Sequence, residues 1–201
     1  YGIAFPQAFA EVYAPIGNGL NIKAGHFYTP IGYETVPAPN NFFYTHAYTM
    51  QYGEPFTHTG VLANYTISKN FTAMAGAIGG SGTGGWDGNF DRQMGNWGGI
   101  GGVTWTSDDT KTSFNISGTG STASTRNSSF WGMYSAVFKH LFADNKTHLV
   151  IQHDHGFADN VLLANLKYGG VVQNAEWYGI NTHVYYDLTP DLSVGVRGEW
   201  F

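Results

Sequence analysis

The stretch EWYGINTHVYYDLTPDLSVGVRGEW, residues 176–200, decides the fold class because it contains two strand patterns joined by a short turn. Between Glu176 and Leu188, the apolar set is Tyr178, Ile180, Val184, Tyr186 and Leu188, and the polar set is Asn181, His183 and Asp187. Between Leu192 and Trp200, the apolar set is Leu192, Val194, Val196 and Trp200, and the opposing set is Ser193, Gly195, Arg197 and Glu199. A period of two residues is typical of a β-strand with one apolar and one polar face. Because Thr189-Pro190-Asp191 supplies turn residues between them, the two segments predict an antiparallel hairpin.

Eight other segments repeat this alternation, and helical periodicity is sustained nowhere in the chain. The ten predicted strands cover residues 7–14, 20–27, 59–67, 71–79, 97–106, 112–118, 130–141, 147–156, 176–188 and 192–200. The sequence therefore predicts an all-β protein.

The connections between these strands alternate strictly between short and long. The short ones are turns rich in Gly, Asn, Asp and Pro, at residues 16–19, 68–70, 107–109, 143–146 and 189–191. The long ones cover residues 28–58, 80–96, 119–129 and 157–175. Outer-membrane barrels have short periplasmic turns and long external loops. We therefore expect an antiparallel up-and-down transmembrane β-barrel with ten strands visible.

The composition favours a membrane protein that crosses with strands. Charged residues make up 11% of the chain, against roughly 25% in a typical soluble domain. No run of about 18 apolar residues exists, so a membrane helix is excluded, whereas barrel strands need only one apolar face. The formal net charge of −5 and the lack of a Lys/Arg cluster argue against a nucleic-acid partner.

The order of turns also fixes an orientation. If the short turns are periplasmic, the first strand enters from outside and the tenth ends outside, at Phe201. Bacterial barrels normally begin and end in the periplasm, so we expect residues 1–201 to form a single barrel domain truncated at both ends. The parent barrel would then have twelve or more strands.

Aromatic residues are predicted near the strand ends, where amphipathic rings meet the membrane–water interface. They are Tyr13, Phe27, Tyr65, Phe71, Trp105, Phe138, Phe142, Tyr186 and Trp200. The alternative is a soluble β-sandwich in which such rings fill the core, but a sandwich does not explain the polar face on every strand.

Several segments resemble one known family. They are GHFYTPIGYE at residues 25–34, PNNFFY at 39–44, PFTHTG at 55–60 and VRGEWF at 196–201. These strings resemble the putative β-barrel porin-2 family, an OmpL-like group, with the likeness covering about residues 7–106 and the last strand. The resemblance implies the outer membrane of a Gram-negative bacterium, with the lipid bilayer and lipopolysaccharide as surroundings. It implies pore formation by class and names no solute.

The segment from Tyr28 to His58 is the strongest candidate for a functional element. It holds four of the seven prolines and many aromatic residues, and loops of this length in compact folds tend to be functional. A loop folded into the barrel would narrow the pore, with Glu34, His46, Glu54 and His58 as constriction residues. The alternative is a loop packed outside as a lid or an oligomer contact.

The alternation of each strand predicts which polar residues line the pore. They are Glu11, Lys23, Asn64, Lys139, Asn181, Asp187, Arg197 and Glu199. Because the charges are of both signs, we expect weak ion selectivity. Pairing between neighbouring strands is the structural alternative.

Other chemistry finds little support in the sequence. His148, His153, Asp154 and His155 are residue types that bind transition metals, but strand alternation separates Asp154 from its two neighbours, so we expect no metal and no cofactor. Asp87, Asp91 and His155 lie in or beside predicted loops, with no nucleophile at a fixed spacing. We therefore do not expect an enzyme.

The leading hypothesis is an outer-membrane porin that lets small hydrophilic solutes or ions diffuse passively. The alternative is a structural or interaction barrel, either a sheath around a partner protein or a surface adhesin. Oligomers are common among porins, but no residue here demonstrates a homo-oligomer. A soluble lectin-like sandwich is a third interpretation and predicts solubility without detergent.

Overall fold

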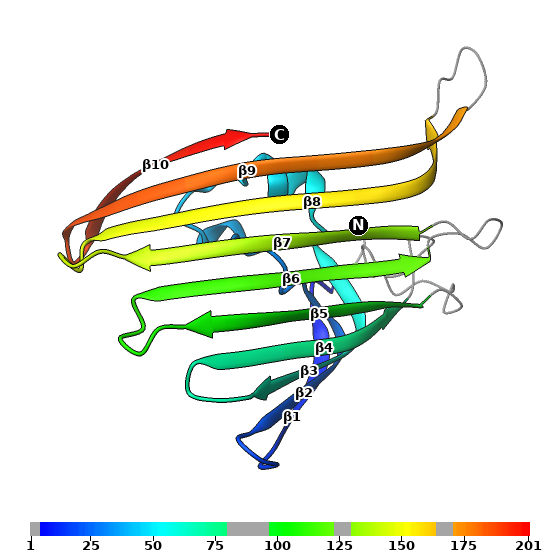
Figure 1. The fold of residues 1–201 in the computed structure, drawn as a ribbon, viewed down its shortest axis with the longest axis horizontal. Helices are drawn as coiled ribbons and strands as arrows, with labels where there is room; N and C mark the ends of the chain where they lie inside the picture. The colour runs from blue at the N-terminus through cyan, green and yellow to red at the C-terminus, as the bar shows by residue number, and fades with distance from the viewer. Residues whose placement is uncertain (1–4, 80–96, 123–129, 164–170) are drawn as a thin grey trace.

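The computed structural model describes residues 5–79, 97–122, 130–163 and 171–201, and its ten strands form one antiparallel sheet in chain order (Figure 1). The strands are β1 (Ala8–Ala14), β2 (Leu20–Tyr28), β3 (Thr57–Thr66), β4 (Phe71–Gly79), β5 (Trp97–Thr106), β6 (Thr112–Thr122), β7 (Phe130–Leu141), β8 (Thr147–Leu163), β9 (Val171–Thr189) and β10 (Leu192–Trp200). Two short helices, η1 (Ala38–Asn40) and the π-helix η2 (Thr49–Gly53), lie between β2 and β3. Within the described residues, none of the helices has the length and apolar character needed to cross a membrane.

The predicted all-β, up-and-down order of ten strands is confirmed. The predicted bounds of β4, β5, β7 and β10 match the observed ones, and β6, β8 and β9 are longer than predicted. Strands β8 and β9 stay paired from Thr147 opposite Tyr186 to Leu163 opposite Val171, with an irregularity between Ala158 and Val161. The backbone hydrogen bonds continue where the side chains no longer alternate between apolar and polar. The sequence pattern therefore predicts strands that are shorter than the observed ones. The predicted long connection at residues 80–96, with Asp87 and Asp91, lies outside the described residues.

The short turns all lie at one end of the sheet and use residues that tolerate left-handed backbone. Gly17 and Gly19 have φ values of 58° and 107°, and Thr110 and Asn145 have φ values of 61° and 55°. The φ of Gly17 is one that residues with a Cβ atom rarely adopt, so the backbone of this turn favours glycine. We call this end of the sheet the short-turn end.

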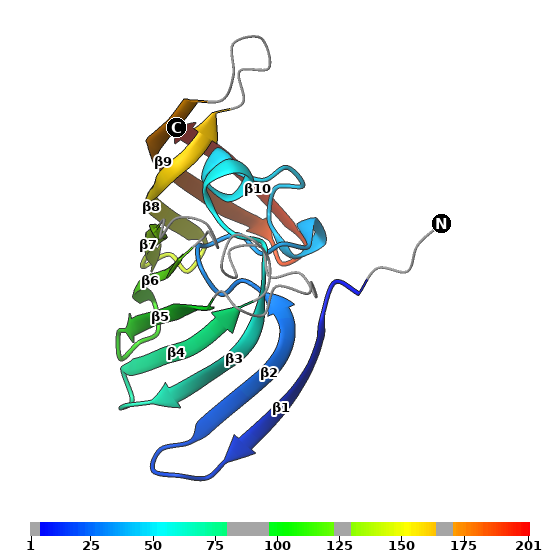
Figure 2. The same ribbon diagram turned by 90° about the vertical axis from the view of Figure 1, so that its right-hand side faces the viewer.

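The sheet is curved, with one concave and one convex face (Figure 2). Among the described residues, β1 pairs with β2 alone and β10 pairs with β9 alone, so the sheet is open between β1 and β10. The strands that would close a complete barrel remain a prediction.

The two faces differ in polarity, as alternation along the strands predicts. Large apolar residues are exposed on the convex face, among them Val61, Val103, Ile116, Ile180, Val184 and Val196. Polar residues are buried on the concave face, among them Ser117, Ser135, Gln152, Asn181 and His183. The concave face also buries apolar residues such as Leu62, Ile100 and Met133. An exposed apolar outside and an inside that carries the polar residues are the arrangement of a barrel that contacts lipid.

Aromatic rings on the convex face gather toward both ends of the strands. Phe71, Phe114 and Tyr186 are exposed toward the short-turn end, and Trp97, Phe130, Tyr178 and Trp200 toward the opposite end. The interface assignment of Phe27 is wrong, because its ring is buried on the concave face with Ile31, Leu62, Ile78 and Ile100. Its place at the end of a strand suggested the membrane interface, but the connection that follows folds inward over it.

Candidate functional site: the inserted loop and the inner wall

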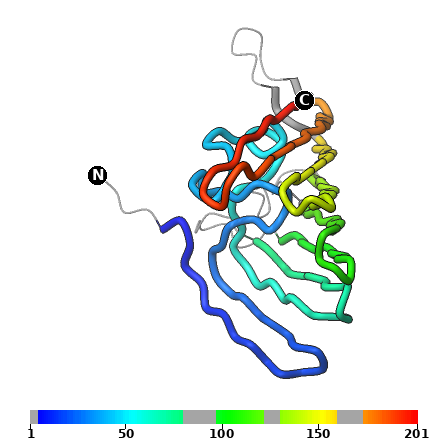
Figure 3. Tube along the Cα trace, turned by 90° about the vertical axis from the view of Figure 1, so that its left-hand side faces the viewer, coloured from blue at the N-terminus to red at the C-terminus, as the bar shows by residue number. Residues whose placement is uncertain are grey.

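Residues 29–56, which we call the inserted loop, lie on the concave side of the sheet (Figures 2 and 3). The loop is tied to the inner faces of β8, β9 and β10, whose residues follow it by about 100 to 160 positions in the sequence. The prediction that this connection folds inward is confirmed by its position. That it narrows a pore remains a prediction.

Arg197 of β10 holds the inserted loop at Glu34 and at Thr45 and His46. Its Nη1 atom donates to Glu34 Oε1 at 3.0 Å and also to the carbonyl of Thr45, and its Nη2 atom donates to the carbonyl of His46 at 3.1 Å. The other carboxylate oxygen of Glu34 accepts the backbone N–H of Ala47 at 2.8 Å. Because both side chains are largely buried, this is a charge-assisted anchor rather than a surface ion pair.

The π-helix η2 is attached to β9 and β10 by three further hydrogen bonds. Asn181 Nδ2 donates to Thr49 Oγ1 at 2.7 Å, and the indole N–H of Trp177 donates to the carbonyl of Gly53 at 3.0 Å. The backbone N–H of Tyr48 donates to Glu199 Oε2 at 2.6 Å. Polar side chains on the inner wall thus satisfy backbone groups that the loop could not satisfy by itself.

Gln152 of β8 joins the two ends of the loop. Its Oε1 accepts the backbone N–H of Tyr33 at 3.0 Å, and its Nε2 donates to Glu54 Oε1 at 2.6 Å and to Asp154 Oδ1 at 2.8 Å. Two carboxyl groups therefore share one amide donor in a buried place, and Glu54 Oε2 has no hydrogen-bond partner. Burial and the nearby charge of Asp154 raise the pKa of the Glu54 carboxyl well above its usual range.

Gly32 makes room for this arrangement. Its φ is 85°, and a Cβ atom there would lie 2.1 Å from Glu54 Oε2. Only glycine fits both the backbone conformation and the close approach of the carboxyl group.

Aromatic packing holds the middle of the loop against β9. The rings of Phe42 and Tyr185 are 4.3 Å apart, and those of Tyr33 and His183 are 5.1 Å apart in an edge-on arrangement. The Tyr185 hydroxyl lies 2.7 Å from His183 Nδ1, which fixes both wall side chains. Ring pairs of this kind stabilise the contact by more than the burial of their apolar area alone.

The predicted constriction residues serve mainly to hold the loop. Glu34 and Glu54 are in the loop as expected but are buried at its junction with the wall, and His46 contacts Glu34 at 3.3 Å. His58 is not in the loop: it belongs to β3, is buried, and lies 3.0 Å from Thr29 Oγ1. The sequence PFTHTG shows no alternation before Thr59, so the start of β3, where Thr57 pairs with Tyr28, was missed.

The strand register places the eight predicted pore-lining residues on the concave face. Asn181, Arg197 and Glu199 are bonded to the inserted loop, so they do not face open space alone. The remaining five line the wall outside the junction: Glu11 opposite Lys23, Asn64 opposite Met74, Lys139 opposite Ser113, and Asp187, whose carboxylate contacts His148 and Ser193.

Sequence reasoning missed Gln152, Asp154, His183 and Tyr185 as contacts of the loop. The alternation of β8 indicates that Gln152 and Asp154 share a face, so their inward position could have been read from the sequence. Their contacts with the loop could not, because nothing local specifies which wall the loop meets. His153 and His155 lie on the opposite face from Asp154, as predicted from alternation.

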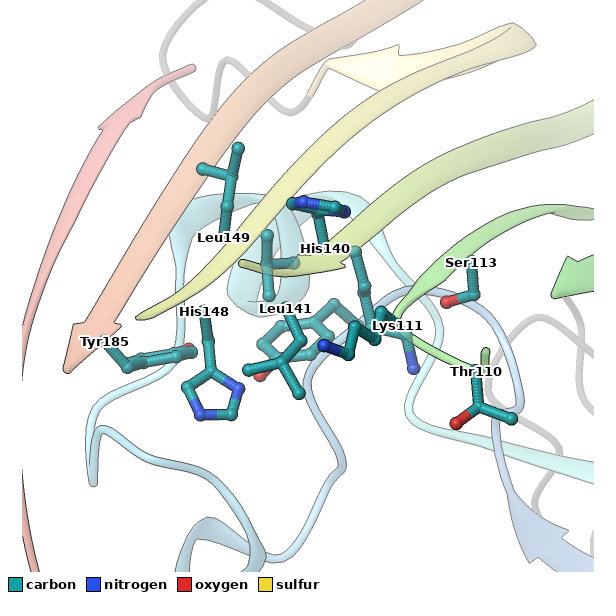
Figure 4. Close-up of a pocket in the computed structure, with 11 residues that line it drawn as sticks. Thr110, Lys111, Ser113, His140, Leu141, His148, Leu149 and Tyr185 are labelled. Atoms are coloured by element: carbon teal, nitrogen blue, oxygen red, sulfur yellow. The ribbon is translucent and has the colours of Figure 1, made fainter. Parts of the chain in front are cut away.

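A cavity of about 220 Å³, lined in part by Tyr33 of the inserted loop, lies toward the short-turn end (Figure 4). Its lining comes from β6, β7, β8, β9 and the turn before β6, and includes Lys111, Ser113, Lys139, His148 and Tyr185. The cavity is therefore bounded by the loop on one side and by the inner wall on the other.

One comparison with known proteins gives a match. The model of a family described as putative beta-barrel porin-2, OmpL-like, matches residues 1–201. The match includes residues 110–175, where the sequence motifs alone showed only a strand pattern. No curated protein and no solved structure matches the chain.

Proposed function

Because this chain belongs to the putative beta-barrel porin-2, OmpL-like family, we propose that it is an outer-membrane porin through which small hydrophilic solutes or ions diffuse passively. Membership in the family makes it a porin-like β-barrel. What we propose beyond family membership is the class of solute, small hydrophilic molecules or ions, and the passive mechanism of their diffusion.

The observation that carries the proposal is the position of the inserted loop. It lies on the polar face of the sheet, where Arg197, Gln152 and Asn181 bind it, while the opposite face exposes apolar residues such as Val61 and Ile180. A loop held inside a barrel reduces the cross-section without sealing it by itself, and the outer face suits lipid.

Passage in this mechanism requires no chemical step. Hydroxyl and amide groups along the inner wall, such as Asn64, Thr72, Thr104 and Asn115, can replace part of the hydration of a solute. We accordingly propose a non-enzymatic protein in the bacterial outer membrane, surrounded by the bilayer and lipopolysaccharide.

The test is single-channel conductance of the detergent-purified, full-length protein in planar bilayers, with insertion measured independently. Stable conductance steps that scale with bulk salt conductivity are expected for a water-filled passage. Inserted protein that remains silent would contradict passive diffusion. The structural or interaction barrel would then be the better explanation, with the loop acting as a plug or a docking element.

A further inference from the structure

The cavity below the inserted loop contains two positive side chains from different strands. Lys139 is on the concave face of β7, directly opposite Ser113 of β6, and Lys111 immediately precedes β6. Figure 4 shows Lys111 between Thr110 and Ser113 on one side and Leu141, His148 and Tyr185 on the other. The two lysines thus line one half-open pocket, in which Lys139 is exposed and Lys111 is half-buried.

Neither ammonium group is neutralised by a direct partner in the described part of the chain. Lys139 Nζ and Lys111 Nζ form no ion pair with a carboxylate and no hydrogen bond there. The only described ion pair of a lysine is the exposed contact between Lys69 and Asp108, 3.2 Å apart. Two cations without a direct partner therefore share one pocket, where their fields add.

Two carboxylates in this part of the molecule already have other partners. Asp187 accepts the hydroxyl of Ser193 at 2.6 Å and lies 2.8 Å from His148 Nε2. Asp109, in the turn beside Lys111, accepts the hydroxyl of Ser107 at 2.6 Å and the backbone N–H of Lys111 at 3.1 Å. The negative charge of Asp109 partly offsets the positive charge of Lys111, but neither Asp187 nor Asp109 forms an ion pair with Lys111 or Lys139.

Farther along the inner wall the cations lie beside carboxylates, and at the loop junction carboxyl groups outnumber the one arginine. Arg197 contacts both Glu34 and Glu199, and Lys23 lies across from Glu11 in the paired strands β1 and β2. Cations that lie beside carboxylates in this way add little to ion selectivity. Lys139 and Lys111 differ, because neither ammonium group contacts a carboxylate in the described part of the chain, although Asp109 lies beside Lys111.

Hydrogen-bond donors complete the cavity. The Ser113 hydroxyl forms no side-chain hydrogen bond with the rest of the described chain, and Tyr33 of the inserted loop also lines the cavity. A volume of about 220 Å³ is room for roughly seven waters, and so for a phosphate or a small carboxylate with part of its hydration shell. Ammonium and hydroxyl groups are the donors that bind such oxyanions.

We infer that Lys111, Lys139 and Ser113 form a subsite for small oxyanions, carboxylates or phosphates, on the passage between the inserted loop and the short-turn end. This inference rests on the proposed porin function and names its preferred solute class. A subsite on a diffusion path must bind weakly enough for release, which suits solvated lysines better than a buried, fully paired arginine.

The test uses the full-length protein in planar bilayers under a potassium chloride gradient. Wild-type channels are expected to pass anions in preference to cations, and added inorganic phosphate should reduce the chloride current. In the double variant Lys111→Gln and Lys139→Gln, the anion-to-cation permeability ratio should fall by about threefold or more, the order expected for two partly screened charges. The phosphate effect should be lost as well.

The controls separate charge from general damage. Lys69→Gln removes a lysine from another short turn, where it is paired with Asp108, and should leave the permeability ratio unchanged. Lys139→Arg keeps the charge and should keep the anion preference. Circular dichroism of each purified variant shows whether the strands are retained.

The outcomes distinguish the subsite from the porin function. Channels that conduct in wild type and variant alike, with the same permeability ratio and the same response to phosphate, would overturn the anion subsite and leave the porin function standing. Wild-type protein that inserts but never conducts would overturn both.

Discussion

Arg197 Nη1 and Glu34 Oε1 lie 3.0 Å apart although the two residues are 163 positions apart in the chain. This pair joins the inserted loop to the tenth strand, and its side chains are 11% and 3% exposed. A connection between the second and third strands is thereby fixed to the opposite side of the concave face. If the lumen is open as proposed, we expect its width at the loop to depend on this long-range contact as well as on the loop itself.

Replacing Arg197 by Gln should release the loop where it is held, at Glu34 and at Thr45 and His46. It leaves the buried carboxylate of Glu34 without its cation and removes the donors to Thr45 and His46, at an expected cost of about 3 kcal/mol in loop docking. Single-channel recordings should show a larger and noisier conductance. The double variant with Glu34→Gln should recover part of the loss, because no unpaired charge remains. Unchanged conductance in Arg197→Gln would show that the pair does not set the width.

The attachment of the loop should weaken as pH rises because of Glu54. Burial and the charge of Asp154 raise the folded-state pKa of this carboxyl above its ordinary value near 4.5, so below that value folded and unfolded forms are both protonated and no penalty exists. As pH rises from there toward the raised pKa, the unfolded state loses its proton first and docking is progressively destabilised. Current fluctuations should therefore increase with pH over this window. Glu54→Gln should flatten the dependence, and an equally steep response in that variant would contradict the assignment.

Gly32→Ala should disturb the same junction by a steric route. Alanine at position 32 would have to adopt a left-handed backbone conformation, which is unfavourable for a residue with a Cβ atom. Its Cβ atom would also lie against Glu54 Oε2. The expected cost is about 1–3 kcal/mol, measured as a lower midpoint in urea titration of the bilayer-inserted protein. Gly198→Ala is the matched control, because a Cβ there would meet nothing within 4 Å. Equal midpoints for the two variants would argue against a strict need for glycine at position 32.

The sequence predicts the sheet far better than the loop, for a physical reason. Strands such as β4 and β10 carry an alternation of period two that burial on one face imposes, so their bounds and faces can be read locally. The inserted loop has no such period. Its inward position was suggested by its length and its prolines, whereas the partners of Glu34, Tyr33 and Glu54 on β10 and β8 depend on how the whole sheet curves. The same limit explains His58, whose strand begins before any alternation is visible.

The convex face should tolerate a charge less well than the concave face of the same strand. Val61 and Asn64 are both exposed on β3, but they lie on opposite faces, Val61 among apolar neighbours and Asn64 beside the polar residues Asn21 and Thr72. If the convex face contacts lipid, Val61→Lys should destabilise insertion by about 2–4 kcal/mol, the cost of a lysine near the middle of a bilayer. Asn64→Lys should cost much less, because its side chain meets water in the lumen. Urea titration of each variant folded into phospholipid vesicles measures the difference. Equal costs for the two lysines would indicate that the apolar face meets water or protein instead of lipid, and would undermine the proposed membrane position of the sheet.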